Sequence, residues 1–382
     1  NYRLFLFGFL VADLMAAGVL SLEELKDRIP DTVYVRYGQE EGLQESLDIP
    51  LVTYPETIDV SDRGSYQIPC SLLGMLPLKT VQVETVEDQW VYVSGTTVGL
   101  YMETQGVLIV DTGEITNQSG VPQEPAANIV QPGDYILEVN GKAVSRKREL
   151  IAEIENCQGE DVELLVNRKG EKIPLSLAPV LTQEEEYKLG IWVRDNTQGI
   201  GTMTYVDEEG KFGALGHGIS DTDTGQLLDV SGGELYQAQI VSIIRGTQGV
   251  PGELSGYIEY DEEKKIGVIE KNTDIGIFGQ IFPGTQLAKE KVMIGYKQEV
   301  KEGKAQLLME SEGKTEKYDI EITEIYGSQQ DTNKSFQIQV TDPKLLAKTG
   351  GIVQGMSGSP ILQDGKLIGA VTHVFVQDSA KG

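Results

Sequence analysis

The apolar residues of this chain occur in short runs that alternate with polar residues, as in half-buried β-strands. Examples are residues 80–85, 240–244, 274–278 and 318–322. The runs are rich in Val and Ile, and turns that use some of the 44 glycines separate them. The pattern therefore predicts a mainly β protein. The 382 residues are enough for two or three domains, each with its own core.

The first 25 residues are expected to form a signal or membrane-anchor segment, and its apolar run at residues 3–20 is interrupted by Asp13. Its length is that of a signal-peptide core or a thin membrane span, although a charge at mid-bilayer costs about 2.5 to 3.5 kcal/mol. We expect export and membrane contact through this segment, with a buried amphipathic helix as the alternative. Residues 26–90 mix strand-like runs with charged connectors, and they are expected to form a stalk and a small β region.

Residues 91–180 combine strands, one helix pattern and strong turn signals. The run QPGDYILEVNGKAV at residues 131–144 contains an Asn-Gly pair that is typical of a hairpin turn. This segment resembles a PDZ domain of the circularly permuted bacterial type. The resemblance implies an α+β domain whose groove accepts a peptide as an added strand and captures peptide termini. It places the carboxylate-binding loop at Val98, Gly99, Leu100 and Tyr101.

Residues 181–382 contain many short β runs with Gly-rich turns, which predict a barrel or sandwich. Their strongest chemical signal is the run GMSGSPI at residues 355–361. A Ser in such a tight turn allows the N–H groups of Gly355 and Ser357 to point at a developing oxyanion. The run resembles the nucleophile motif of chymotrypsin-like peptidases. Ser357 is therefore the candidate nucleophile, and Ser359 is the next in line.

A serine hydroxyl needs a base within hydrogen-bonding reach, and the chain has only two histidines. His217 lies between two glycines and precedes Ser357, in the order of chymotrypsin-like enzymes. His373 alternates with apolar neighbours on a strand after the serine, and we interpret it as a packed or surface residue. His217 is therefore the candidate general base.

Four carboxylates compete for the role of orienting His217: Asp221, Asp229, Asp274 and Asp342. Asp221 and Asp229 are near the histidine in sequence. Asp274 opens an Asp-Ile-Gly-Ile run like the Asp strand of chymotrypsin-like enzymes. The residues by themselves favour Asp274.

The runs GALGHGISDTDTG, NTDIGIFG, VTDPKLL, GGIVQGMSGSPI and GKLIGAVTHVFV together resemble the stage IV sporulation protein B peptidase family. The similarity extends from about residue 30 to the C-terminus. It implies a PDZ domain followed by a peptidase domain with a chymotrypsin-like double β-barrel, and a triad of His217, Asp342 and Ser357. The triad acid would then lie only 15 residues before the serine (357 minus 342), which departs from the ordinary chymotrypsin layout.

The resemblance also implies a biological role. Such proteins are made in the forespore, exported to the space between its two membranes, and cleave themselves near the N-terminus. They then cleave a membrane-protein regulator of an intramembrane metalloprotease, which leads to maturation of a late sigma factor. Family members continue beyond Gly382, so we expect the peptidase domain to be truncated here. The alternatives are a non-catalytic PDZ adaptor at the membrane and, with its domains in the reverse order, a periplasmic-type protease.

The amino-acid composition limits the kinds of partner and cofactor that we expect. The net charge of -27 opposes binding to phosphate backbones, so nucleic acid is not an expected partner. Two His and two Cys residues are too few for a zinc site, and we expect no metal and no cofactor. Cys70 and Cys157 fall in different segments, and their pairing does not follow from the sequence.

Overall fold

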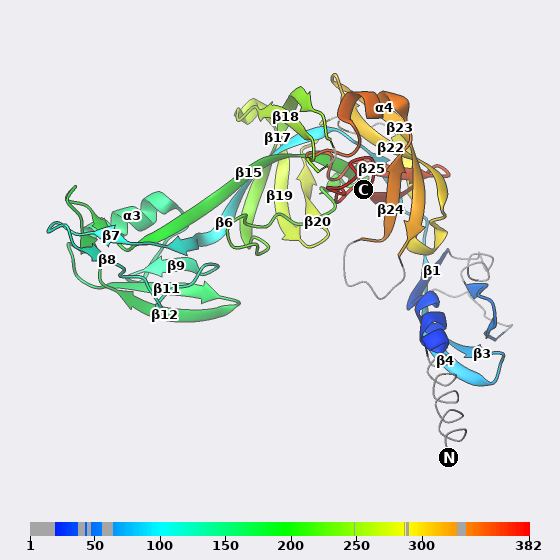
Figure 1. Ribbon diagram of the computed structural model, residues 1–382, viewed down its shortest axis with the longest axis horizontal. Coiled ribbons are helices and arrows are strands. Elements are labelled where there is room, and N and C mark those ends of the chain that lie inside the picture. The colour runs from blue at the N-terminus through cyan, green and yellow to red at the C-terminus, as the bar shows by residue number, and fades with distance from the viewer. Residues whose placement is uncertain are drawn as a thin grey trace, which may run out of the picture.

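The computed structural model describes residues 20–36, 43, 47–55, 64–247, 249–285, 287, 290–326 and 334–382. Figure 1 shows an elongated molecule, with a small sheet at the N-terminal end, an α+β unit at the opposite end and a large β unit between them. The predicted fold class, mainly β with a PDZ-like part and a barrel-containing peptidase part, is confirmed. Most of the predicted apolar segment, residues 1–19, lies outside the described residues. No helix within the described ranges is long and apolar enough to span a membrane.

The N-terminal sheet has its own core. Residues 20–28 are helical, and the strands are β1 (Thr32–Arg36), β2 (Val52–Thr53), β3 (Ser65–Leu72) and β4 (Leu76–Val86). Their order is β1-β4-β3-β2, with β1 parallel to β4. Alternate residues of β1 and β4, such as Val33 and Val81, are fully buried in a cluster that also contains Ile29 and Leu47. The alternation of apolar and polar residues along these strands thus gives the sheet one apolar face.

The large β unit encloses two apolar clusters, which we call the first and second barrels. The first barrel uses β5 (Trp90–Val93), β6 (Thr97–Thr112), β15 (Ile191–Val206), β16 (Lys211–Ala214), β17 (Val230–Ile244), β18 (Glu253–Ile258), η1 (Glu262–Lys264), β19 (Lys265–Thr273) and β20 (Gly276–Ile281). The second uses β21 (Glu290–Ile294), η2 (Lys297–Glu299), β22 (Gly303–Ser311), β23 (Lys314–Ile325), β24 (Phe336–Val340), α4 (Pro343–Thr349), β25 (Pro360–Gln363) and β26 (Lys366–Ala370).

The α+β unit, here called the PDZ-like unit, lies between β6 and β15 in the chain. Its elements are β7 (Ile115–Thr116), β8 (Pro122–Gln123), β9 (Tyr135–Val139), β10 (Lys142–Ala143), α3 (Lys147–Asn156), β11 (Val162–Arg168), β12 (Glu171–Leu177), β13 (Val180–Leu181) and β14 (Tyr187–Lys188). Leu150 and Ile154 of α3 pack on buried residues of β9 and β11. A buried ion pair of Arg168 with Asp134, at 2.7 Å, fixes the loop before β9.

Two long strands belong to both the PDZ-like unit and the first barrel. β6 and β15 pair as an antiparallel ribbon from Thr97↔Thr202 to Thr112↔Ile191. Val98 and Met102 contribute to the barrel cluster, whereas Val107 and Ile109 of the same strand contribute to the PDZ-like cluster. Figure 1 shows this ribbon as the connection between the two units. Residues 90–104 therefore build the barrel although they precede the PDZ-like unit in the chain.

This arrangement corrects the prediction of a carboxylate-binding loop at Val98, Gly99, Leu100 and Tyr101. All four residues lie in β6, where β15 pairs with one edge and β17 with the other. Their main-chain groups are therefore used within the sheet, and Val98 and Leu100 are buried in the barrel cluster. A strand that is paired on both edges has no free N–H groups with which to capture a peptide terminus.

Candidate active site

Ser357 lies in a tight loop between α4 and β25 that hydrogen bonds from β15 hold in place. The Thr202 N–H donates to the Ser357 carbonyl at 3.0 Å, and the Thr202 hydroxyl donates to the Gly355 carbonyl at 2.9 Å. The Thr204 hydroxyl donates to the carbonyl of Gly358 at 2.7 Å. A Cβ on Gly358 would lie 2.1 Å from the Thr202 carbonyl oxygen, so only glycine fits this close approach.

The main chain of this loop supplies donors beside the serine hydroxyl. Within the described part of the chain, the N–H groups of Gly355 and Ser357 have no hydrogen-bond acceptor. Gly355 has a φ of +94°, a left-handed conformation that favours glycine. Two free N–H groups next to a nucleophile are what an oxyanion hole requires.

The second serine of the motif has a different environment. The side chain of Ser359 is 0% exposed, and its hydroxyl has no hydrogen-bond partner among the described residues. Ser357, in contrast, is half-buried and borders a cavity. Only Ser357 is therefore accessible to a substrate.

His217 lies in a loop that follows β16, and a neutral amide from β19 holds this loop. Asn272 accepts a hydrogen bond from the Ile219 N–H at 2.9 Å and donates to the Ile219 and Leu228 carbonyls at 2.8 and 2.9 Å. The Gly218 N–H donates to the main-chain carbonyl of Asp274 at 3.2 Å. The loop is thereby fixed at three main-chain positions.

The imidazole of His217 is oriented by its own loop. Its Nδ1 lies 2.8 Å from the carbonyl oxygen of Gly218. A carbonyl oxygen only accepts hydrogen bonds, so this contact requires the proton on Nδ1 and leaves Nε2 with its lone pair. This tautomer is the one that accepts a proton from a serine hydroxyl.

His217, Ser357 and Gly355 line one cavity of about 310 Å³. The other walls come from β6 and β15, with Leu100, Met102, Thr197, Gln198, Gly199 and Ile200, and from Leu215, Ile219 and Gln354. The structure thus brings the predicted nucleophile, base and oxyanion donors together from residues 140 positions apart (357 minus 217). Such a half-open pocket with a few convergent polar groups is typical of an enzyme site.

Asp342 does not contact this cavity. Its carboxylate caps the N-terminus of α4, accepting hydrogen bonds from the N–H groups of Lys344 at 2.8 Å and Leu345 at 3.2 Å. Its second oxygen accepts from the Asp319 N–H at 3.3 Å. The role of Asp342 as triad acid stays a prediction. The sequence pattern favoured Asp274 as the triad acid, and the family resemblance favoured Asp342. Of these two residues, Asp274 contacts the histidine loop, through its main-chain carbonyl.

The other two candidate acids have partners of their own. Asp221 is buried and forms an ion pair with Arg194 of β15. Asp229 donates its N–H to the Tyr135 hydroxyl at 3.0 Å, at the border of the PDZ-like unit. Both residues therefore connect the first barrel to the PDZ-like unit.

The second histidine lies beside the first. The ring centroids of His217 and His373 are 6.2 Å apart, and His373 also lines a larger apolar cavity of about 560 Å³ between the barrels. Partial burial, together with the nearby charges of Lys334 and His217, lowers the pKa of His373. His373 is therefore biased toward the neutral form next to His217.

The described residues contain no group of three or more His, Cys, Asp or Glu side chains that could hold a metal ion. Cys70 and Cys157 are free thiols in the N-terminal sheet and the PDZ-like unit.

Comparison with known families agrees with this geometry. The family model described as SpoIVB peptidase S55 matches residues 185–382, which is just over half of the chain. The chain belongs to the SpoIVB peptidase S55 family. A second model, for a PDZ domain, matches residues 118–168. The crystal structure of the PDZ domain of an SdrC-like protein from Listeria monocytogenes shares 21% identity over 23% of this chain and 87% of its own, with a TM-score of 0.19.

Membership of the SpoIVB peptidase S55 family makes this protein a serine peptidase that carries a PDZ domain. The predicted family resemblance is confirmed. Sequence reasoning missed Asn272 and Thr202, which position the two loops.

Proposed function

We propose that this serine peptidase acts in sporulation signalling, where it cleaves itself near the N-terminus and then cleaves a membrane-protein regulator of an intramembrane metalloprotease. Export into the space between the two forespore membranes, with the N-terminal segment as the membrane contact before self-cleavage, belongs to the same proposal. Its support is the family membership and the cavity that His217 and Ser357 share.

The proposed mechanism is acyl transfer. Nε2 of His217 accepts the proton of the Ser357 hydroxyl as its oxygen attacks the substrate carbonyl. The N–H groups of Gly355 and Ser357 stabilise the oxyanion, and His217 returns the proton to the leaving amine. Water then hydrolyses the acyl-enzyme in the reverse sequence. In this proposal Asp342 is the acid that stabilises the charged imidazole.

One observation carries the proposal: an accessible serine and a histidine whose Nδ1 faces the Gly218 carbonyl border the same cavity as two unused main-chain N–H groups. Replacing Ser357 by Ala should abolish self-cleavage on a gel and leave the circular dichroism spectrum unchanged. Ser359→Ala is the matched control, because its hydroxyl is buried without a partner. That variant should cleave itself normally and be at least as stable as the parent protein.

A fluorophosphonate probe separates this function from the alternative of a non-catalytic PDZ adaptor. The parent protein and Ser359→Ala should be labelled at Ser357, and Ser357→Ala should not be labelled. Unlabelled parent protein in its folded state would favour the adaptor. Self-cleavage that persists in Ser357→Ala would move the nucleophile elsewhere.

A further inference from the structure

The outer half of β15 has one hydrogen-bonding edge that no strand covers. From Ile191 to Gly201 the strand pairs with β6 only, and its pairing with β16 and β5 begins at Met203 and Tyr205. Within the described chain, the registers that involve β15 are those with β6, β16 and β5, and only the one with β6 includes this stretch. Its main-chain groups are therefore open to an added strand along about ten residues, or about 33 Å.

One end of this edge has the features of a carboxylate-binding loop. Leu189 and Gly190 form the short connection from β14 to β15, and their N–H groups have no acceptor among the described residues. Gly190 has a φ of +68°, and its carbonyl accepts from the Gly113 N–H at 2.8 Å, which fixes the loop. Free N–H groups that precede an open strand edge capture the terminal carboxylate of a peptide.

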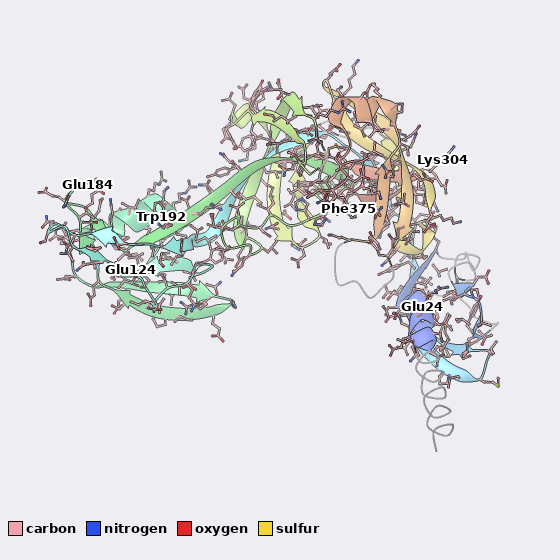
Figure 2. The ribbon with its side chains drawn as sticks, in the orientation of Figure 1. Glu24, Glu124, Glu184, Trp192, Lys304 and Phe375 are labelled. Carbon is pink, nitrogen blue, oxygen red and sulfur yellow. The ribbon has the colours of Figure 1, made fainter. Side chains whose placement is uncertain are left out.

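The helix α3 flanks the same edge. The Lys147 N–H at its N-terminus donates to the Asp195 carboxylate of β15 at 2.8 Å. Ile191 and Val193 of β15 pack on the cluster that contains Leu150 and Ile154 of α3. An open strand edge beside a helix, with an apolar floor, is the groove in which an extended peptide adds to a sheet. Figure 2 shows Trp192 of this strand in the PDZ-like unit, far from Phe375 of the barrels.

The other end of the edge reaches the active site. Residues 197–200 of β15 line the cavity together with His217 and Ser357. Two residues further on, Thr202 hydrogen-bonds to the Ser357 carbonyl. One strand therefore extends from the carboxylate-type loop to the nucleophile, with register shifts against β6 at Trp192/Val193 and Arg194/Asn196.

We propose that β15 is a ruler for substrates other than this chain itself, and that it sets the cleaved bond at a fixed distance from their free C-terminus. A peptide with its carboxylate at Leu189 and Gly190 runs antiparallel to β15, because its chain direction points toward that connection. Eleven positions separate Ile191 from Thr202 (202 minus 191), so the bond near Ser357 lies about ten residues upstream of the C-terminus. Hydrolysis there consumes one water and releases a C-terminal fragment of about ten residues. The ruler rests on the proposed peptidase activity of Ser357.

The test uses a library of 25-residue peptides of mixed sequence, made once with free C-terminal carboxylates and once with C-terminal amides. Mass spectrometry measures the length of each C-terminal product. With free carboxylates, the product lengths should cluster at about ten residues. Amidation removes the charged group that Leu189 and Gly190 recognise, and it should reduce the yield of these products at least about tenfold.

The outcomes separate the ruler from the peptidase. Cleavage that depends on Ser357 but gives product lengths without a cluster, or the same cluster in both libraries, would overturn the ruler and leave the peptidase intact. No Ser357-dependent cleavage in either library, while the parent protein is folded, would overturn the proposed function and the ruler with it.

N-methylation of one cleaved peptide tests strand addition without altering the enzyme. Methyl groups are placed singly on the main-chain nitrogens of the last nine residues. Because N–H groups of an added strand alternate in direction, cleavage should fall at every second position and remain at the positions between. An even loss at all positions, or no loss at any, would contradict binding along β15.

Discussion

The loops that carry Ser357 and His217 are held in different ways. The serine loop is bound by main-chain and hydroxyl groups of β15, a strand that continues into the PDZ-like unit. The histidine loop is bound mainly by the amide of Asn272 in β19, which belongs to the first barrel alone. The position of the nucleophile is therefore mechanically connected to the peptide-binding end of the molecule, whereas the base has a local support.

The largest effect concerns the acid that is proposed to stabilise the charged imidazole of His217. Asp342→Asn keeps a good N-cap on α4, so the melting temperature should change little. If Asp342 orients His217 as proposed, kcat on a cleaved peptide should fall about 10³- to 10⁴-fold. Asp274→Asn is the matched variant, because Asp274 contacts the same loop through its main chain. Full activity in Asp342→Asn together with a loss of this size in Asp274→Asn would transfer the role to Asp274.

The second-largest effect on kcat is expected from Asn272, which holds the histidine loop. Asn272→Ala removes one acceptor and both donors from the histidine loop, leaving the Ile219 N–H and two carbonyls without this partner. We expect stability to fall by about 2 to 3 kcal/mol in urea unfolding and kcat to fall about 100-fold. Fluorophosphonate labelling should slow in parallel. Asn167→Ala, which removes a turn contact in the PDZ-like unit, is the control and should retain kcat.

The support of the nucleophile predicts a smaller effect. Thr202→Val keeps the shape of the side chain and deletes the hydrogen bond to the Gly355 carbonyl. We expect a loss of about 1 kcal/mol and a fall in kcat of about fivefold, since Gly355 carries one oxyanion donor. Thr202→Ser retains the hydroxyl and should stay within about twofold of the parent enzyme. Equal kinetics for Val and Ser would show that β15 positions the loop through its main chain only.

The sequence predicted the chemistry of the site better than its supports. Ser357, Gly355 and His217 could be found because each lies in a short run whose glycines and spacing are required by the backbone. Asn272 has no such signature, because a neutral amide in a strand looks like any surface residue. Its function depends on which loop the fold places opposite it.

The misplaced carboxylate loop has a related cause. The alternation of Val98, Leu100 and Met102 indicates a strand with one buried face, but it does not identify the core that buries this face. β6 and β15 each extend from the core of the first barrel into the core of the PDZ-like unit. The alternation of apolar and polar residues does not change where one core ends and the other begins. The partners of a strand on its two edges are a property of topology, which local pattern does not encode.

The smallest effect on catalysis is expected from an ionic cluster remote from both loops. Glu299 accepts hydrogen bonds from Arg36 of β1, at 3.0 Å, and from Lys366 of β26, at 2.7 Å, and so ties the N-terminal sheet to the second barrel. Burial of Glu299 opposes its ionisation, but these hydrogen bonds outweigh burial and lower the pKa of Glu299 to about 2. The stabilisation is therefore fully present above about pH 4.5 and is lost as the pH falls toward about 2.

Glu299→Gln should accordingly be less stable than the parent protein by about 2 to 3 kcal/mol at pH 7, and the difference should vanish near pH 2 in thermal unfolding curves. Glu302→Gln, three positions away on an exposed side chain, is the matched control and should show no such pH dependence. At pH 7 both variants should retain the kcat of the parent enzyme, because neither loop uses this cluster. A large fall in kcat for Glu299→Gln would mean that the N-terminal sheet also helps to position Ser357. Support of the serine loop by β15 and of the histidine loop by Asn272 would then not account for the whole site.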